Sequence, residues 1–213
     1  MRAVLVVLVG VLPASPTKNR LLNALGHRID PSARIHPVLL WRIGLMEFAP
    51  GVTLWSLSRF RGLRRMTLGR DVLIMRFNHI YAEPITADML VADSDAVGVL
   101  SIADKSMLNL NHTIDCTGGF FMGTWSGMGG REVFVSTHEF DPAVGRVTVA
   151  PSWLGSNSMV AARTSLSTGA VVPDRCALGM GGVMMPGADT QETLYGGVPA
   201  RPVRDIADWT VMQ

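Results

Sequence analysis

A six-residue repeat between Leu154 and Met184 constrains the fold of this chain more than any other feature. Each step opens with an apolar residue, in the order Leu154, Val160, Leu166, Val172, Leu178 and Met184. Four places further on stand small residues, namely Ser158, Thr164, Ala170, Cys176 and Gly182. This spacing fits neither an amphipathic helix nor an alternating strand over its whole length. It predicts a parallel β-helix, in which short strands form the sides of stacked coils and the leading apolar residues fill the interior.

The same step occurs earlier in the chain, with two interruptions. It is carried by Leu68, Ile74 and Ile80, and later by Ile102, Leu108, Ile114 and Phe120. Between these runs, residues 81–98 contain Pro84 and four acidic residues and show no clear register, so they form either an irregular coil or an excursion. A glycine-rich passage, GTWSGMGGRE, then shifts the register ahead of VFVSTHEFDPAVGRVTVAPSW.

The chain opens with an apolar run, MRAVLVVLVGVLP, which is too short to span a bilayer unaided. We interpret it as a strand or helix packed on the domain or as a shallow membrane contact, with a signal peptide as the less favoured alternative. The next stretch, 15–29, reads as a short helix with Ser15 as its cap, Pro16 in its first turn and Gly26 at its end. Its apolar stripe would consist of Leu21, Leu22 and Leu25 and would cover the open end of the coil.

No linker divides the chain, so we expect one domain. Residues 1–30 would form the N-terminal apolar segment and capping helix, 31–200 the β-helix, and 201–213 a tail with a short amphipathic segment. A net charge of +2 is too small to indicate a nucleic-acid partner. Cys116 and Cys176 lack metal-ligand spacing and fit free thiols in a reducing compartment. We therefore expect a cytoplasmic protein, with membrane association through the N-terminus left open.

Four ordered motifs carry a resemblance to a known family. They are NLNHTID from Asn109 to Asp115, VSTHEFDP around His138, PSWLGS from Pro151 to Ser156, and GGVPARPVR from Gly196 to Arg204. From about Ser32 to Arg204 the chain resembles the bacterial hexapeptide-repeat acyltransferases of the galactoside, maltose and xenobiotic acetyltransferase branch. The resemblance implies a left-handed parallel β-helix. Together with the helical patterns near the two ends of the chain, it predicts a mainly all-β fold with short N- and C-terminal helical segments. It also implies a homotrimer with active sites between subunits.

The resemblance further implies transfer of an acetyl group from acetyl-CoA, or another acyl-CoA, to a hydroxyl of a sugar, glycan or glycolipid without an acyl-enzyme. His138 is the expected general base, because an imidazole can take a proton at neutral pH. Asp115 and Glu139 are the candidates to orient it, the alternative being acidic turn residues. Asn109 and Asn111 would bind the acceptor, since an amide both donates and accepts hydrogen bonds. The alternatives are turn residues or an asparagine ladder along the coils.

The acyl-CoA carrier would lie in a groove near the last coils. Its expected contacts are Trp153, Ser156, Gly179 and Met180, with Arg201 and Arg204 pairing with its phosphates. Simple packing of the tryptophan and solvated tail arginines are the alternatives. This chain has Gly182 and Met185-Pro186 where the family has a serine and a threonine-lysine pair, which leaves the details of carrier binding open.

Two other functions remain open from the sequence. The first is a non-catalytic trimeric β-helix that acts as a scaffold or binding module. The second is a zinc enzyme of the carbonic-anhydrase branch, which would need His112 and His138 together with a third histidine. His79 is the only nearby third histidine and its context is unsuitable, so no metal is expected. Acylation of an amino-sugar nitrogen instead of a hydroxyl is also open, since the base chemistry is similar.

Overall fold

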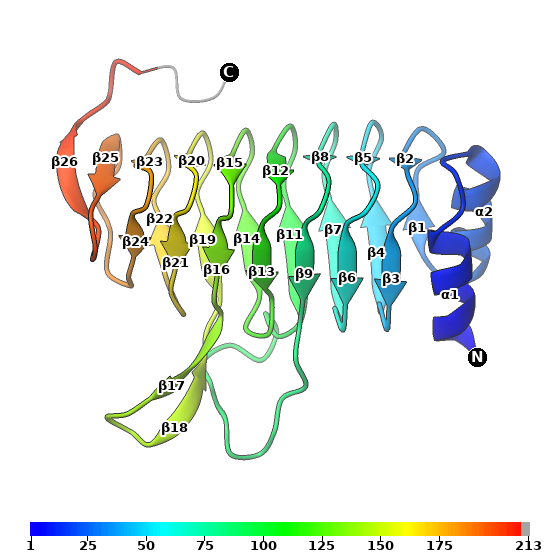
Figure 1. Ribbon diagram of the computed structural model, residues 1–213, viewed down its shortest axis with the longest axis horizontal. Helices are drawn as coiled ribbons and strands as arrows, with labels where there is room; N and C mark the ends of the chain where they lie inside the picture. Colours follow the sequence, from blue (N-terminus) through cyan, green and yellow to red (C-terminus); the bar gives the residue numbers. More distant parts are fainter. Residues whose placement is uncertain (210–213) are drawn as a thin grey trace.

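The computed structural model describes residues 1–209, and the main body of the protein is a three-sided β-helix (Figure 1). Each turn of the coil contributes one short strand to each of three sheets, which we call walls A, B and C. We name each corner by the two walls it links, so that the C–A corner connects a wall C strand to the next wall A strand. The predicted β-helix is therefore confirmed.

Within each wall, neighbouring coil strands pair in parallel. Wall A consists of β1 (Arg28–Ile29), β4 (Leu45–Phe48), β7 (Arg65–Leu68), β11 (Val99–Ile102), β14 (Phe120–Met122), β19 (Ser152–Leu154) and β22 (Val171–Val172). Wall B consists of β2 (Arg34–Ile35), β5 (Thr53–Leu54), β8 (Leu73–Ile74), β12 (Met107–Leu110), β15 (Gly127–Arg131), β20 (Met159–Val160), β23 (Ala177–Leu178), β25 (Thr193–Gly196) and β26 (Arg201–Asp205). Wall C consists of β3 (Leu39–Trp41), β6 (Arg59–Arg61), β9 (His79–Tyr81), β13 (Thr113–Asp115), β16 (Phe134–Val135), β21 (Ser165–Leu166) and β24 (Val183–Met184).

The six-residue repeat forms the core as predicted. The leading residues of the final run are at most 1% exposed, and they occupy walls A, B and C in turn: Leu154, Val160, Leu166, Val172, Leu178 and Met184. Burying each such side chain stabilises the fold by about 1.5–3 kcal/mol. The small residues sit inside the corners, where Ser158 accepts a hydrogen bond from the Cys176 amide and donates one to the carbonyl of Pro173, at 3.0 and 2.6 Å. A larger side chain at Ser158 would displace both corner bonds.

Two helices cover the N-terminal end of the coil: α1 (Arg2–Gly10) and α2 (Pro16–Ala24) (Figure 1). The Ser15 hydroxyl accepts a hydrogen bond from the Lys18 amide at 3.2 Å, as expected of a helix cap. Gly26 follows the helix with φ +92°, a left-handed conformation that favours glycine. Leu22 is fully buried, whereas Leu21 is 42% exposed, so the predicted apolar stripe is narrower than expected.

Two long passages leave the coil at the C–A corner and pair with each other. Residues 82–98 are an excursion that contains β10 (Leu90–Val91), and residues 136–151 contain a hairpin of β17 (His138–Asp141) and β18 (Arg146–Val149). The three strands form a small sheet in the order β10-β18-β17. Figure 1 shows the hairpin of β17 and β18 and the long loop projecting from one side of the coil. The open question about residues 81–98 is thus settled in favour of an excursion.

The C-terminal part differs from the expected helical segment. Residues 201–205 form β26, which pairs antiparallel with β25 and extends wall B. All five side chains of β26 are exposed, so this segment lacks the alternation of buried and exposed residues by which a sequence indicates a strand. Residues 210–213 of the expected tail lie outside the described residues. Strands extend beyond both ends of the expected 31–200 domain, because β1 begins at Arg28.

Candidate active site

His138 and Asp115 form a hydrogen-bonded pair at the C–A corner. Asp115 ends β13, and His138 begins β17 just after β16, which is the next wall C strand. The stacking of these coils brings His138 Nδ1 to 2.7 Å from Asp115 Oδ2. The carboxylate side chain is 1% exposed and the imidazole side chain 27% exposed. A buried acidic group thus holds a histidine that solvent or a substrate can reach.

Two threonines complete the environment of the Asp115 carboxylate. The amide and hydroxyl of Thr117 donate to Oδ1 at 2.9 and 2.5 Å, and the amide and hydroxyl of Thr137 lie within 2.8 Å of Oδ2. A carboxylate with these donors only accepts hydrogen bonds, so His138 Nδ1 must carry a proton. The second ring nitrogen, Nε2, is then left with a free lone pair, as a general base requires.

Sequence reasoning gave no role to these two threonines. Thr137 directly precedes His138 in THE, and Thr117 stands two places after Asp115 in DCT. Their closeness in sequence to the two site residues could therefore have indicated a role. Gly118 lies against the same cluster, and its amide donates to the Thr137 hydroxyl at 2.8 Å. A Cβ at Gly118 would lie 2.6 Å from the carbonyl oxygens of both Thr137 and Ala150. The close packing of this corner therefore fixes the position of Asp115.

Glu139, the other candidate to orient the base, does not contact His138. It follows His138 in β17, and successive side chains of a strand point to opposite faces. The residue is exposed, and its carbonyl accepts a hydrogen bond from the Thr148 hydroxyl at 3.3 Å. Of the two acidic residues proposed from the sequence, the structure brings only Asp115 to the imidazole.

The excursion at 82–98 braces the hairpin that begins with His138. Leu90 and Val91 pair with Thr148 and Val149, and Val149 is the partner of His138 in the hairpin. At the outer end, Arg146 Nε donates to the carbonyl of Asp88 at 2.7 Å. Two long insertions that would each be mobile alone therefore support each other beside the imidazole.

A polar cluster that sequence reasoning missed adjoins the pair. Tyr81 is the register partner of Asp115 on wall C, and the Arg61 guanidinium lies 5.6 Å from the centre of its ring. Arg61 also forms an ion pair with Glu83, whose amide donates to the Thr117 hydroxyl at 2.9 Å. Burial, Asp115 and Glu83 raise the pKa of Tyr81, so its phenol stays protonated at neutral pH. These residues are not the apolar leading residues of the six-residue repeat, so the periodicity gave no indication of the cluster.

The two asparagines lie at a different corner of the same chain. Asn109 is near the end of β12 and Asn111 follows it at the B–C corner, with φ +58° at Asn111. Asn78 Nδ2 donates to the carbonyl of Asn109 at 2.8 Å, which ties this corner to the preceding coil. Wall C separates these residues from His138, so a single chain does not join them.

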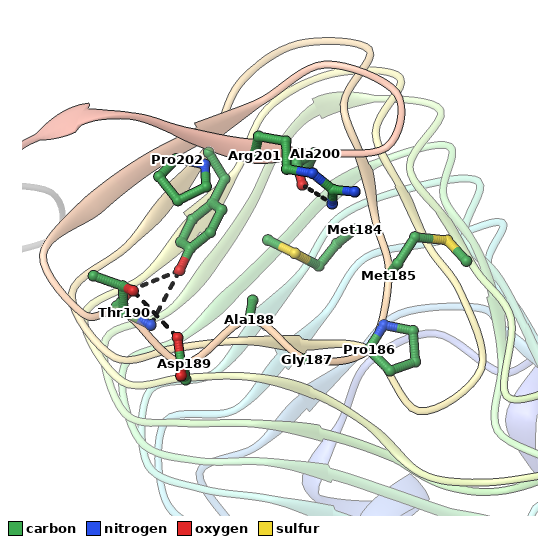
Figure 2. Close-up of a pocket in the computed structure, with 11 residues that line it drawn as sticks. Met184, Met185, Pro186, Gly187, Ala188, Asp189, Thr190, Ala200, Arg201 and Pro202 are labelled. Carbon is green, nitrogen blue, oxygen red and sulfur yellow. Dashed lines mark hydrogen bonds between the residues drawn. The ribbon is translucent and has the colours of Figure 1, made fainter.

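The six carrier candidates are distributed over the coil. Trp153 lies on the outer face of wall A, stacks on Phe121 at 4.1 Å, and borders a pocket of about 490 Å³ that also includes Asp174. Arg201 borders a second pocket, of about 160 Å³, between Met185, Pro186 and β26 (Figure 2). Both pockets lie beyond His138 toward the C-terminal end of the coil.

The other carrier candidates have partners of their own or lie at other corners. Ser156 is at the A–B corner, where its amide donates to Asp174 Oδ1 at 2.7 Å. Gly179 and Met180 follow β23 at the B–C corner, and Met180 is 75% exposed. The Arg204 guanidinium lies 4.6 Å from the centre of a ring of Trp209. Of the six candidates, Trp153 and Arg201 border the two pockets described above.

His112 is a structural residue of the interior. It is 1% exposed, its Nδ1 accepts a hydrogen bond from the Val133 amide at 3.1 Å, and its Nε2 lies 3.3 Å from the carbonyl of Met128. Both ring nitrogens are thus occupied, and neither is available to a zinc ion. Among residues 1–209, no group of three or more His, Cys, Asp or Glu side chains is arranged to hold a metal.

Burial lowers the pKa of His112 to about 4, which makes stability depend on pH. The unfolded chain binds a proton near its ordinary pKa of about 6.5 and the folded one does not, so stability falls as the pH drops from 6.5 to 4. His112 should account for on the order of 3 kcal/mol of this loss. His27, with its pKa lowered to about 4 by burial and by Arg2, acts in the same direction.

Melting curves between pH 7 and pH 4 measure this effect. The wild type should lose stability steeply across the window, and His112→Gln should show a shallower slope whatever its stability at pH 7. Equal slopes for the two proteins would contradict the assignment.

Comparison with known proteins places the fold. No family model and no curated protein sequence matches the chain. A mutant of AntD, an N-acyltransferase from Bacillus cereus in complex with dTDP-4-amino-4,6-dideoxyglucose and coenzyme A, is similar with a TM-score of 0.54 and 13% identity, over 76% of this chain and 82% of that chain. A hexapeptide-repeat-containing acetyltransferase from Vibrio cholerae, in complex with acetyl coenzyme A, has a TM-score of 0.50 and 13% identity, over 97% and 86%. The chain therefore has the left-handed β-helix fold of the hexapeptide-repeat acyltransferases.

Proposed function

We propose that the protein is an acyl-CoA-dependent acyltransferase that moves an acetyl group to a hydroxyl of a sugar, glycan or glycolipid. The observation that carries this proposal is the pair of His138 and buried Asp115 at the C–A corner. His138 Nε2 takes the proton of the acceptor hydroxyl while the hydroxyl oxygen attacks the thioester carbonyl carbon. The carbon–sulfur bond of the tetrahedral intermediate then breaks, and the imidazolium returns the proton to the departing thiolate.

The cysteines of the chain support direct transfer without an acyl-enzyme. Cys116 is fully buried, and burial raises the pKa of its thiol well above the ordinary value. Cys176 is also buried, and burial is again the main cause that raises the pKa of its thiol. A thiol attacks as its thiolate, so neither residue is suited to hold the acyl group.

The surface beyond His138 fits an extended carrier such as the pantetheine arm of coenzyme A. Along the C–A corner, the small residues Ala150 and Gly169 and then Pro186 follow one another; a Cβ built on Gly169 would lie 3.7 and 3.6 Å from Ala150 and Pro186. This low strip leads from the imidazole to the pocket beside Arg201, whose guanidinium suits a phosphate (Figure 2). Both solved structures described above contain coenzyme A or its acetyl ester.

A homotrimer would join groups that one chain keeps apart. His138 and both pockets border the C–A corner or wall A, whereas Asn109, Gly179 and Met180 lie near the B–C corner. If the B–C corner of one subunit faced the C–A corner of the next, acceptor and carrier contacts would meet at the imidazole. Light scattering should then give three times the chain mass of 23.0 kDa.

The choice between oxygen and nitrogen acceptors needs matched substrates. A base at His138 serves either atom, and the N-acyltransferase AntD was crystallised with an amino sugar nucleotide. The purified protein should be incubated with acetyl-CoA and pairs of sugars that differ only in a hydroxyl or an amine. Thiol release and product mass then identify the acceptor.

We expect acceptor-dependent thiol release and a hydroxyl product. Release with the amino sugars alone would leave acyl transfer in place and overturn the oxygen assignment. Failure to bind acetyl-CoA or any other acyl-CoA in calorimetry would favour the non-catalytic scaffold instead.

A further inference from the structure

From Val4 onward, the outer face of α1 is apolar. Its exposed side chains are those of a single helical face and of the turn that follows, between 41% and 57% exposed: Val4, Leu5, Leu8, Val11 and Leu12. The opposite side of the helix, with Val6 and Gly10, is buried against the coil. A helix on the surface of a globular domain normally turns polar residues to solvent. A contiguous exposed aliphatic face indicates a contact with something outside the chain.

The protein holds this face rigidly. Arg2 Nε donates to the carbonyl of Leu25 at 2.8 Å at one end of α1. At the other end, the buried ammonium of Lys18 donates to the carbonyls of Gly10 and Leu12 at 2.7 and 2.9 Å, and it also reaches the carbonyls of the first coil. A Cβ at Gly10 would lie 2.9 Å from the carbonyl oxygen of Val38, so the helix sits close against the coil. The leucines therefore cannot turn inward to be buried.

The adjoining strand adds to the apolar face. β3 packs against α1, and its outward side chains Leu39 and Trp41 are each 40% exposed. An indole combines an apolar body with a polar N–H, a combination that is favoured at the level of lipid headgroups. We call α1, the two residues after it, Leu39 and Trp41 the end face.

The charge around the end face is positive. Up to Met46 the sequence has six basic residues and one acidic residue, whereas the rest of the chain has 13 basic and 16 acidic residues. Lys18 is buried, but Arg2, Arg20 and Arg42 are exposed and belong to α1, to α2 and to the residue that follows β3. An apolar surface rimmed by arginines matches anionic lipid headgroups above acyl chains.

We propose that the end face docks the protein on an anionic lipid surface. No helix within residues 1–209 is both long and apolar enough to cross a bilayer, so α1 would lie in the interface. The leucines would enter the boundary between headgroups and acyl chains, and the arginines would contact lipid phosphates. This contact is independent of the proposed acyl transfer, because α1 lies at the opposite end of the coil from β24 and β26, which border the pocket beside Arg201 (Figure 1).

Co-sedimentation with vesicles tests the proposal without any activity measurement. The full chain should bind vesicles of phosphatidylcholine mixed with phosphatidylglycerol, and it should bind pure phosphatidylcholine vesicles much less. Leu8→Asp should lower binding by about tenfold, because it places a charge at the centre of the end face. Leu8 is 57% exposed, so the melting temperature should not change.

Val203→Asp is the matched control. Val203 is 62% exposed and lies on β26, at the other end of the coil, so this variant adds the same charge without touching the end face. It should bind vesicles like the wild type. No binding of the wild type to anionic vesicles, or equal binding of Leu8→Asp, would overturn the proposal. So would a lower particle mass for Leu8→Asp without lipid, which would show that the end face contacts a second copy of the chain.

Discussion

His138→Ala is expected to lower the rate of acetyl transfer by about 10²–10⁴-fold, the usual contribution of a general base. The loss should be mainly in kcat, because the proton transfer occurs in the transition state. Folding should be nearly unaffected, since the imidazole side chain is 27% exposed and its partner Asp115 keeps four other hydrogen bonds. A large kinetic effect with an unchanged melting temperature would separate catalysis from stability.

The measurement is thiol release at saturating acetyl-CoA and acceptor, with His36→Ala as the control. His36 directly follows β2 and stacks on Trp55 at 4.7 Å, so its removal also deletes an imidazole but leaves the C–A corner intact. The control should retain turnover. Full turnover by His138→Ala would exclude this residue as the base. In a separate outcome, a wild type that released no thiol with any acceptor would favour the non-catalytic scaffold.

The repeat predicted the architecture because the apolar residue that opens each step is itself a sign that this position is buried. A side chain at the start of a step points into the interior, and this does not depend on the sequences of the neighbouring coils. Leu154 and Val172 can therefore be assigned to the core from the sequence alone. The excursion at 82–98 has no such local signal. Its strand β10 exists because β18 lies beside it, and that partner comes from residues more than 50 positions later. Non-local pairing of this kind is not visible in periodicity.

The geometry of the candidate site could be predicted from the sequence only in part. His138 and Asp115 stood in recognisable motifs, but their contact depends on how much chain each coil uses. The sequence alone does not distinguish Glu139 from Asp115 as the partner of the imidazole, because it does not predict β17 as a strand. In the structure, alternation along β17 directs Glu139 to the opposite face from His138. The sequence could in principle have predicted that the carrier candidates lie at different corners, because three six-residue steps make one coil. Counting by 18 from Leu154 places Ser156 and Gly179 at different corners.

Asp115→Asn tests whether the aspartate acts through the histidine. The amide keeps the shape of the side chain but presents an NH₂ group, which must oppose either His138 Nδ1–H or one of the threonine donors. We expect a loss of about 1–3 kcal/mol in the free energy of unfolding from the mismatched buried donors. Turnover should fall by at least about tenfold, because the imidazole loses the partner that fixes its proton on Nδ1.

The double variant with His138→Ala distinguishes positioning from a purely structural role. If Asp115 contributes to turnover only by orienting the imidazole, Asp115→Asn should reduce turnover no further once His138 is absent, whereas the loss of stability should persist. Assays well below the melting temperature of each variant keep the two effects apart. A multiplicative fall in turnover would contradict the orienting role and assign Asp115 a separate contact with the substrate. The buried cluster of Asp115, Thr117 and Thr137 would then be part of the substrate site as well as the support of the base.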